Sequence, residues 1–446
     1  MNFDSSTGRC HSINVLISPP CDHIDFMKIT ILGLWHLGCV TAACMARHHR
    51  VIGLDFDEPV LAKLRAGIAP LHEPELDTLI AAGVESGKLT FSSDITKSKD
   101  SEVLWICYDT PVDADDRSDL DWVFSRLHRV LPEMSVGTVV LLSSQLAVGT
   151  CAQLTQHYPE LIFACSPENL RLGKAIDAFE HPARIIVGTP PDGRPRLEAL
   201  LSPIEAPLIW MRTESAEMVK HALNSFLALS VAYINEIASL SETVGADAQE
   251  VAMGLKSDPR IGTRAYLGPG GPFAGGTLAR DVVTLSQLGS ANDIPLSLIP
   301  AIKESNDRHR GWAFRKTQTA LANVDRPIVA VLGLAYTPNT NTLRRSSAVE
   351  LCRHLLADSV EVRAFDPLIK SVDNEHSDIP VVSSIEEALL GAHCVVVCTE
   401  WPDFLDYDWP TLFAKMTSPV VIDANRYLEK TVAEITDVRF LTVGHQ

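Results

Sequence analysis

Two stretches of the chain alternate between strand-like and helix-like segments, and this alternation restricts the fold more than any other feature. In the first stretch, apolar runs recur from Met27 to Gly188, and segments with helical apolar spacing separate them. Such alternation predicts a parallel sheet with helices on both faces. Strands are expected at 27–33, 51–55, 103–108, 138–144, 161–165 and 184–188, with helices at 34–49 and 59–66.

A long helical segment separates this stretch from a second one. Apolar residues with helical spacing run from Thr213 to Gly254, a Gly/Pro-rich loop occupies 267–276, and more helix follows to about Asn323. The second alternation has strands expected at 326–333, 360–365, 393–399 and 420–423. We therefore predict an α/β protein with two Rossmann-like doubly wound domains joined by a long central helix. The predicted domains are 27–212, 213–324 and 325–446, preceded by an extension at 1–26.

The extension has none of the features of a targeting signal. Residues 1–26 lack the basic and apolar regions of a signal peptide, and Met27-Lys28 opens the first expected strand directly. The segment is interpreted as disordered or as the product of a misassigned start, and it is set aside in the fold prediction.

Composition narrows the possible partners. The chain is 46% hydrophobic, and no apolar run reaches the roughly 18 residues of a spanning helix. Its net charge of −18 argues against nucleic acid and anionic membranes, but local sites for phosphate remain possible. The ten cysteines include no C-x-x-C pair, so free thiols in a cytoplasmic protein are expected, without a metal site.

A glycine-containing turn lies between the first expected strand and helix. Gly33 and Gly38 fit a dinucleotide-binding fingerprint, in which the first glycine permits a tight turn and the last permits close packing of helix on strand. Trp35 stands where a glycine usually lets the backbone approach the pyrophosphate. Asp55 ends the second strand, where an acid accepts hydrogen bonds from the ribose and repels a 2′-phosphate, which favours NAD over NADP. The predicted cofactor contacts are Gly33, Trp35, His36, Leu37, Gly38, Asp55, Thr110 and Ser144.

Beyond this turn the sequence resembles the UDP-glucose/GDP-mannose dehydrogenase family over nearly its whole length from Met27. Six segments carry the resemblance in the family's order: VIGLDFDEPVLAKLRAGIAPLHEPEL, SPENLRLGKA, ESAEMVKHALNSFLAL, DPRIGTRAYLGPGGPFAGGTLARD, GLAYTPNTNTLRRSSA and TEWPDF. The resemblance implies an NAD-dependent oxidoreductase, with a first domain that binds NAD, a central domain that forms a homodimer, and a C-terminal domain that binds a nucleotide sugar.

The family's nucleophilic cysteine is missing. Family members oxidise an alcohol of a nucleotide sugar twice, through an aldehyde captured by a cysteine thiolate and a thioester that water releases. Alignment of the family loop without gaps places Thr277 at the cysteine position, and no cysteine occurs from residue 166 to 351. A threonine hydroxyl is a far weaker nucleophile than a thiol. Thr277 is therefore expected to line the pocket rather than to attack.

The other differences from the family pattern also fall into those that affect the first hydride transfer and those that affect the thioester half of the reaction. The second glutamate of the acyl-release loop is Leu172, and the threonine of the S-T-V-P-P-G-T stretch is Gln145. Lys220, Asn224, Asp281 and Glu168 are kept, and in the family the first three orient water and the reacting oxygen. The parts for the first hydride transfer are thus retained, and those for the thioester half are lost. For Lys220 and Asn224, which lie one helical turn apart, the alternative is a solvated helix face.

The substrate-binding positions are altered in part. Arg280 replaces the loop lysine, and in the C-terminal domain Thr337 replaces the lysine that faces the sugar nucleotide. Arg344 is kept, as is Arg260, which in the family reaches the partner subunit's site. The substrate contacts implied by the resemblance are Arg260, Tyr266, Phe273, Gly275, Arg280 and Arg344.

Three functions remain open from the sequence. The first is an NAD-dependent dehydrogenase that performs one two-electron alcohol/carbonyl step on a nucleotide sugar or another anionic alcohol. The second is a non-catalytic homologue that binds nucleotide and regulates or scaffolds, to which Trp35 and Thr277 point. The third is an epimerase-like enzyme that recycles bound NAD.

Overall fold

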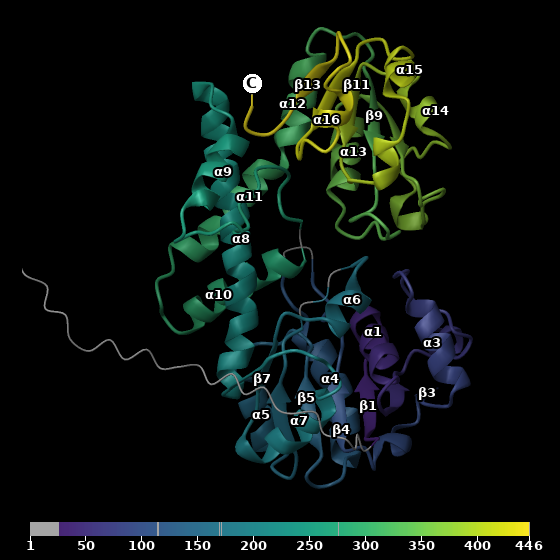
Figure 1. Ribbon diagram of the computed structural model, residues 1–446, viewed down its shortest axis with the longest axis vertical. Coiled ribbons are helices and arrows are strands. Elements are labelled where there is room, and N and C mark those ends of the chain that lie inside the picture. Colours follow the sequence, from purple (N-terminus) through teal and green to yellow (C-terminus); the bar gives the residue numbers. More distant parts are fainter. Residues whose placement is uncertain (1–25, 114–115, 169, 171, 275, 446) are drawn as a thin grey trace, which may run out of the picture.

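The computed structural model describes residues 26–113, 116–168, 170, 172–274 and 276–445. Residues 1–25 of the extension and the predicted substrate contact Gly275 lie outside the described residues. Within them, two sheets occupy opposite ends of the molecule, and a long helix runs beside them (Figure 1). The architecture is α/β with two Rossmann-like domains and a helical centre, as the sequence predicts.

The N-terminal sheet has eight strands in the order β3-β2-β1-β4-β5-β6-β7-β8. Its neighbours pair in parallel except β6 and β7, which meet in antiparallel fashion at Cys165 and Gly188, so the prediction of a wholly parallel sheet is wrong at that point. The strands are β1 (Lys28–Leu32), β2 (Arg50–Leu54), β3 (Leu89–Ser92), β4 (Val103–Ile106), β5 (Val139–Leu142), β6 (Ile162–Cys165), β7 (Ile185–Gly188) and β8 (Leu208–Met211).

Helices cover both faces of this sheet, because successive strand residues point to opposite sides. In β4, Val103 and Trp105 join one hydrophobic cluster, whereas Leu104 and Ile106 join the other. Burial on both faces explains why the strands read as continuous apolar runs. The helices are α1 (His36–Met45), α2 (Glu58–Arg65), α3 (Leu76–Glu85), α4 (Leu120–Val130), α5 (Thr150–His157), α6 (Ala175–Glu180) and α7 (Arg194–Leu201).

The central region contains α8 (Thr213–Val244), α9 (Ala248–Ser257), α10 (Thr277–Ala291), α11 (Leu298–Arg310) and α12 (Trp312–Leu321). The sequence predicts one helix from Thr213 to Gly254, and this is wrong. Gly245 takes the left-handed conformation, with φ +73°, and ends α8. The carboxylate of Asp247 then accepts a hydrogen bond from the backbone N–H of Gln249, 2.8 Å away, and starts α9.

The C-terminal sheet is parallel, with the order β10-β9-β11-β12-β13. Its strands are β9 (Ile328–Leu332), β10 (Glu361–Phe365), β11 (Cys394–Val397), β12 (Val420–Asp423) and β13 (Arg439–Leu441). Its helices are α13 (Ser347–Ala357), α14 (Ile385–Leu389), α15 (Trp409–Phe413) and α16 (Glu429–Val432).

Polar contacts tie the C-terminal domain to the central helices. Arg426 donates two hydrogen bonds to the Asp247 carboxylate, at 2.8 and 2.7 Å, and Asn425 Oδ1 accepts one from Gly271 N at 2.7 Å. The backbone of Gly444 packs against Ala238 and Ala248, where a Cβ on the glycine would lie 2.2 Å from that of Ala248. The C-terminal domain is therefore fastened to α8 and α9 along more than one segment.

Helix α8 is long and apolar enough to cross a membrane, but half of its apolar window is buried in the protein, and core helices commonly have this character. It packs against α10 and α11. The cysteines of the described residues are free thiols, and all except Cys398 are buried.

Candidate active site

The turn after β1 requires both of its glycines. Gly33 has φ +96°, and its N–H donates to Leu54 O at 3.0 Å. A Cβ on Gly33 would lie 2.6 Å from the Tyr108 ring, and one on Gly38 would lie 1.7 Å from Gly33 O. No real side chain tolerates either contact, so the tight turn and the close approach of α1 to β1 both depend on glycine.

Trp35 occupies this turn without backbone strain. It immediately precedes α1 with φ −98°, and 44% of its surface is exposed, so the indole is not packed into the interior. His36 Nε2 lies 2.8 Å from the buried carboxylate of Glu73. The N–H of Leu37 points toward Asp109 Oδ2, 3.4 Å away. Asp109, which follows β4, is a neighbour of this helix start that the sequence analysis did not single out.

The Asp55 carboxylate holds the same turn from the end of β2. Its Oδ2 accepts the N–H of Leu34 at 2.6 Å, and its Oδ1 accepts the N–H groups of Phe56 and Asp57 at 2.6 and 3.2 Å. One acceptor position remains on Oδ2, which a ribose hydroxyl can use. Asp57 itself caps α2 through Val60 N at 3.2 Å.

Unsatisfied polar atoms lie at the carboxyl ends of the neighbouring strands. Ser144 Oγ after β5 and Tyr108 Oη after β4 are buried and have no hydrogen-bond partner within the described part of the chain. Thr110 Oγ1 donates to Gln145 O at 2.8 Å. Because buried polar groups are normally paired, these atoms fit a bound polar ligand such as a dinucleotide.

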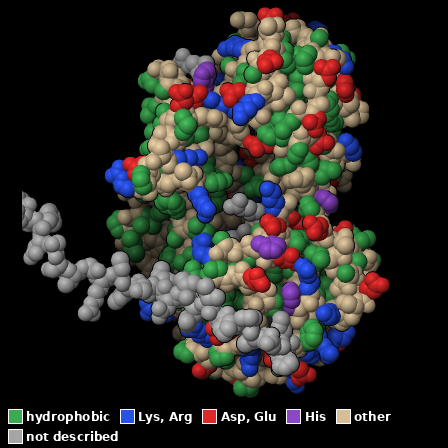
Figure 2. Space-filling view, viewed as in Figure 1, with side chains coloured by type: hydrophobic (Ala, Val, Ile, Leu, Met, Phe, Trp, Pro, Cys, Tyr) green, Lys and Arg blue, Asp and Glu red, His purple; other side chains and the backbone are tan. Residues whose placement is uncertain are grey.

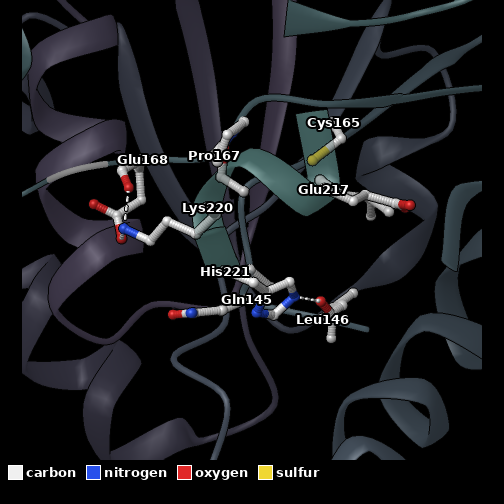
Figure 3. Close-up of a pocket in the computed structure, with 11 residues that line it drawn as sticks. Gln145, Leu146, Cys165, Pro167, Glu168, Glu217, Lys220 and His221 are labelled. Carbon is white, nitrogen blue, oxygen red and sulfur yellow. Dashed lines mark hydrogen bonds and ion pairs between the residues drawn. The ribbon is translucent and has the colours of Figure 1, made fainter. Parts of the chain in front are cut away.

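A pocket opens where the carboxyl ends of β5 and β6 face the first turns of α8 (Figure 3). Lys220 Nζ donates to Glu168 O at 2.5 Å and lies 3.9 Å from Glu168 Oε1. Lys220 is 9% exposed and Asn224 is 4% exposed, so a solvated helix face is excluded for both. Cys165 also lines the pocket, but burial raises the pKa of its thiol well above the ordinary value.

Asp281, at the start of α10, is fully buried behind this pocket. Gln145 Nε2 and Asn224 Nδ2, the latter at 2.5 Å, donate hydrogen bonds to its carboxylate, and His221 Nδ1 lies 2.8 Å from Asp281 Oδ1. Arg280 donates to Gln145 Oε1, and burial lowers the pKa of its guanidinium. The sequence analysis assigned Asn224, Arg280 and Asp281 to the site. The structure adds Gln145 and His221 to the same cluster.

The N-terminus of α10, where Thr277 lies, contacts residues of both flanking domains. Thr277 is the first residue of α10, and its side chain is exposed. Gly276 N donates to Asp116 Oδ1 at 3.0 Å, and Arg345 of the C-terminal domain pairs with the same carboxylate. Sequence reasoning missed both Asp116 and Arg345, because each contacts residues more than a hundred positions away.

The structure places the remaining predicted substrate contacts in different surroundings. Arg260 is highly exposed and pairs with Asp258, and Tyr266 and Arg344 are also exposed. Phe273 is buried in a hydrophobic cluster with Ala228 and other residues of the central helices. A hollow lies between the two sheet-containing lobes, and Lys and Arg side chains border it (Figure 2).

Comparison with known proteins identifies the family of this chain. Residues 27–202 match the NAD binding domain of the UDP-glucose/GDP-mannose dehydrogenase family, residues 214–308 its central domain, and residues 330–430 its UDP binding domain. The chain is 32% identical to a UDP-glucose 6-dehydrogenase of Rhizobium meliloti (strain 1021), covering 94% of this chain and 99% of that protein.

Solved structures show the same similarity. A UDP-glucose dehydrogenase from Pyrobaculum islandicum superposes with a TM-score of 0.86 at 26% identity, over 96% of this chain and 100% of that one. A UDP-D-ManNAc dehydrogenase from Pyrococcus horikoshii has a TM-score of 0.83 at 26% identity, over 94% and 99%. The matched NAD binding domain identifies the cofactor as NAD, and the chain belongs to the UDP-glucose/GDP-mannose dehydrogenase family.

Proposed function

We propose that this protein is an NAD-dependent dehydrogenase that performs a single two-electron step between an alcohol and a carbonyl of a nucleotide sugar. The observation that carries the proposal is Thr277 at the nucleophile position, in a chain that retains Lys220, Asn224 and Asp281. NAD, when bound, supplies the acceptor for the hydride. The chain then has to bind the substrate, stabilise the developing charge on its oxygen and take its proton.

Two side chains of the pocket suit these tasks. Lys220 places an ammonium beside the pocket, where it stabilises negative charge on the reacting oxygen. The Glu168 carboxylate, 3.9 Å from Lys220 Nζ, takes the hydroxyl proton as the hydride leaves the carbon. The alcohol thereby loses one hydride and one proton and becomes a carbonyl, which balances the step.

The second half of the family's reaction lacks its parts. Burial raises the pKa of the Cys165 thiol, so this pocket cysteine is a poor substitute for the missing nucleophile. The Asp281 carboxylate is fully buried, accepts hydrogen bonds from Gln145 and Asn224, and lies 2.8 Å from His221 Nδ1, so it has little capacity left to orient a water molecule. Both features support release of the carbonyl product without conversion to an acid.

The substrate is proposed to be anionic. Arg280 lies one turn after Thr277 on α10, and Arg345 lies against the neighbouring Gly276, so two guanidinium groups lie near Thr277 although the chain as a whole carries −18. The match of residues 330–430 to a UDP binding domain supports a nucleotide sugar. The changes at Thr337 and Arg280 argue against assuming UDP-glucose itself.

The test is the stoichiometry of NADH to product. We expect one NADH per turnover and an aldehyde or ketone by mass analysis when NAD is supplied with a panel of UDP- and GDP-sugars. Thr277→Cys supplies a thiol but leaves Leu172 and the engaged Asp281, so a covalent adduct is expected to accumulate on the protein. Cys165→Ala is the matched control and should leave the stoichiometry at one. Two NADH and an acid product from the unmodified protein would refute the proposal.

We also propose a homodimer in the cytoplasm, with α8 at the contact. Phe226, Tyr233 and Leu240 are 64%, 47% and 62% exposed and lie seven residues apart, which puts them on one face of the helix. Such a stripe normally marks an association surface. Light scattering should give twice the mass of the chain, and Leu240→Lys should shift the protein toward the monomer. A monomeric unmodified protein would contradict this assignment.

A further inference from the structure

His221 is the buried residue that the proposed reaction leaves unexplained. It follows Lys220 on α8, and 2% of its surface is exposed. Its two ring nitrogens face different acceptors, Nδ1 toward Asp281 Oδ1 at 2.8 Å and Nε2 toward Leu146 O at 3.0 Å, the latter drawn in Figure 3. A backbone carbonyl can only accept a hydrogen bond, so Nε2 must carry a proton.

Asp281 requires a proton on the other ring nitrogen as well. The orientation of Gln145 is fixed by Arg280, which donates to its Oε1, so its Nε2 donates to Asp281. Asn224 Nδ2 donates to the second oxygen. Gln145 and Asn224 therefore both donate to the carboxylate, and a proton on His221 Nδ1 makes this nitrogen the third donor. A neutral histidine has one N–H, whereas an imidazolium has two.

Two other buried histidines differ in their surroundings. His49 Nε2 faces Leu200 O at 3.1 Å, but its Nδ1 has no partner in the described part of the chain. His309 Nε2 faces Gly270 O at 2.7 Å. Burial lowers the pKa of both rings, as expected for histidines that stay neutral. His221 differs from them because a carboxylate lies against one nitrogen and a carbonyl against the other.

We propose that His221 is a positioning residue, present as an imidazolium, which holds Asp281 as a carboxylate and through it fixes the amide of Asn224 beside the reacting oxygen. This inference rests on the proposed function. A fully buried carboxylate needs a compensating charge, and the imidazolium supplies it at contact distance. Charged groups of the surrounding elements are Glu217 and Lys220 on α8, Arg280 on α10 and Glu168 after β6.

Neighbouring residues of α8 therefore have different roles. Lys220 faces the pocket and Glu168, whereas His221 and Asn224 bind Asp281. The cluster cannot hand a proton to water because its carboxylate is buried and its donors are engaged. It acts as a rigid support for Asn224, and the reaction uses Lys220 and Glu168.

The charge of His221 can be read without any substrate. In full-length protein labelled with ¹⁵N-histidine, we expect at pH 7.5 a ring with both nitrogens protonated whose signal disappears in His221→Gln. Asp281→Asn removes the carboxylate and should convert the ring to the neutral form. His49→Gln should remove a neutral ring instead. A neutral His221 in the unmodified protein would overturn the proposal, whatever the outcome of the activity tests.

The positioning role is read from kinetics. His221→Gln should lower kcat roughly 10- to 100-fold with KM for NAD unchanged, because misplacement of about 1 Å has effects of this size. Retention of full kcat would overturn the positioning role even if the ring is charged. Should His221→Gln fold poorly, the double variant with Asp281→Asn removes the uncompensated charge and should fold, still with low kcat. An inactive unmodified protein would refute the proposed function and leave the NMR result to decide the charge of His221.

Discussion

The first strand of each sheet ends in the same kind of turn. Gly33 follows β1 with φ +96° and donates to Leu54 O at 3.0 Å, and Gly333 follows β9 with φ +85° and donates to Phe365 O at 2.8 Å. In both domains an aspartate after the neighbouring strand then accepts the N–H of the residue after the glycine, Leu34 or Leu334, at 2.6 and 2.7 Å.

The two aspartates differ in what else they hold. Asp366 is fully buried and accepts four backbone N–H groups and the indole N–H of Trp401. Asp55 is partly exposed and keeps an acceptor position on Oδ2. The turn after β1 thus leaves a carboxylate acceptor available to a ligand, whereas the turn after β9 uses its carboxylate entirely for contacts within the domain. The two turns differ in whether all acceptor positions of the carboxylate are already taken by hydrogen bonds within the protein.

The substitution with the largest expected effect on the turn after β1 is Gly38→Ala. Its Cβ would lie 1.7 Å from Gly33 O, so α1 must move away from β1. We expect NAD affinity to fall more than about 100-fold and the protein to lose roughly 2–3 kcal/mol of stability. Calorimetric NAD titration and urea unfolding measure the two effects. Gly254→Ala, in open space on α9, is the control and should stabilise by about 0.5–1 kcal/mol.

Asp366→Asn tests the contribution of the corresponding turn after β9 to the stability of the C-terminal domain. An amide can accept fewer of the five hydrogen bonds and leaves buried donors unpaired, so we expect a loss of about 3 kcal/mol in stability. Affinity for NAD should stay the same. A drop in NAD affinity with unchanged urea unfolding would show that the two domains use their aspartates alike.

Asp55→Asn should give the opposite pattern. Loss of the carboxylate at the ribose position should weaken NAD binding about tenfold, equivalent to about 1.4 kcal/mol, with a smaller change in stability than Asp366→Asn. Discrimination against NADP should also weaken, because the repulsion of a 2′-phosphate is gone. Unchanged affinities for both dinucleotides would remove Asp55 from the cofactor site.

Trp35→Gly has the smallest expected effect. A glycine lets the backbone come closer to the pyrophosphate, and we expect NAD affinity to rise about threefold, which corresponds to roughly 0.7 kcal/mol. The half-exposed indole of the unmodified protein makes a larger gain unexpected. Weaker binding in the variant would mean that the indole of Trp35, and not only its backbone, contacts the cofactor.

Much of the fold follows from local pattern. The strands from β1 to β12 that the alternation predicts are present, because buried parallel strands must be apolar on both faces. The sequence analysis missed β3, β8 and β13, which have three or four residues each and lie toward the sheet edges. It also extended α8 past Gly245, because a single glycine in an apolar helical pattern does not reveal its left-handed conformation.

The candidate site was less accessible to such reasoning. Lys220 and Asn224 could be singled out from their spacing and family motif, but their partners come from distant segments. His221 contacts Asp281 across 60 positions and Leu146 across 75, and Arg345 reaches Asp116 across 229. No periodicity within one helix records such contacts. Only the arrangement of the strands and helices brings them together.

The contact of Gly444 with α8 implies a delay during synthesis, because the two segments are made at different times. Its N–H donates to Glu242 across 202 residues of chain, and its backbone fills the space beside Ala238 and Ala248. At a translation rate of about 5–20 residues per second, α8 therefore waits roughly 10–40 s for this neighbour after it is made. During that interval an apolar helix stands partly uncovered, and a nascent chain is most open to chaperones, to misassembly and to premature pairing with a second copy.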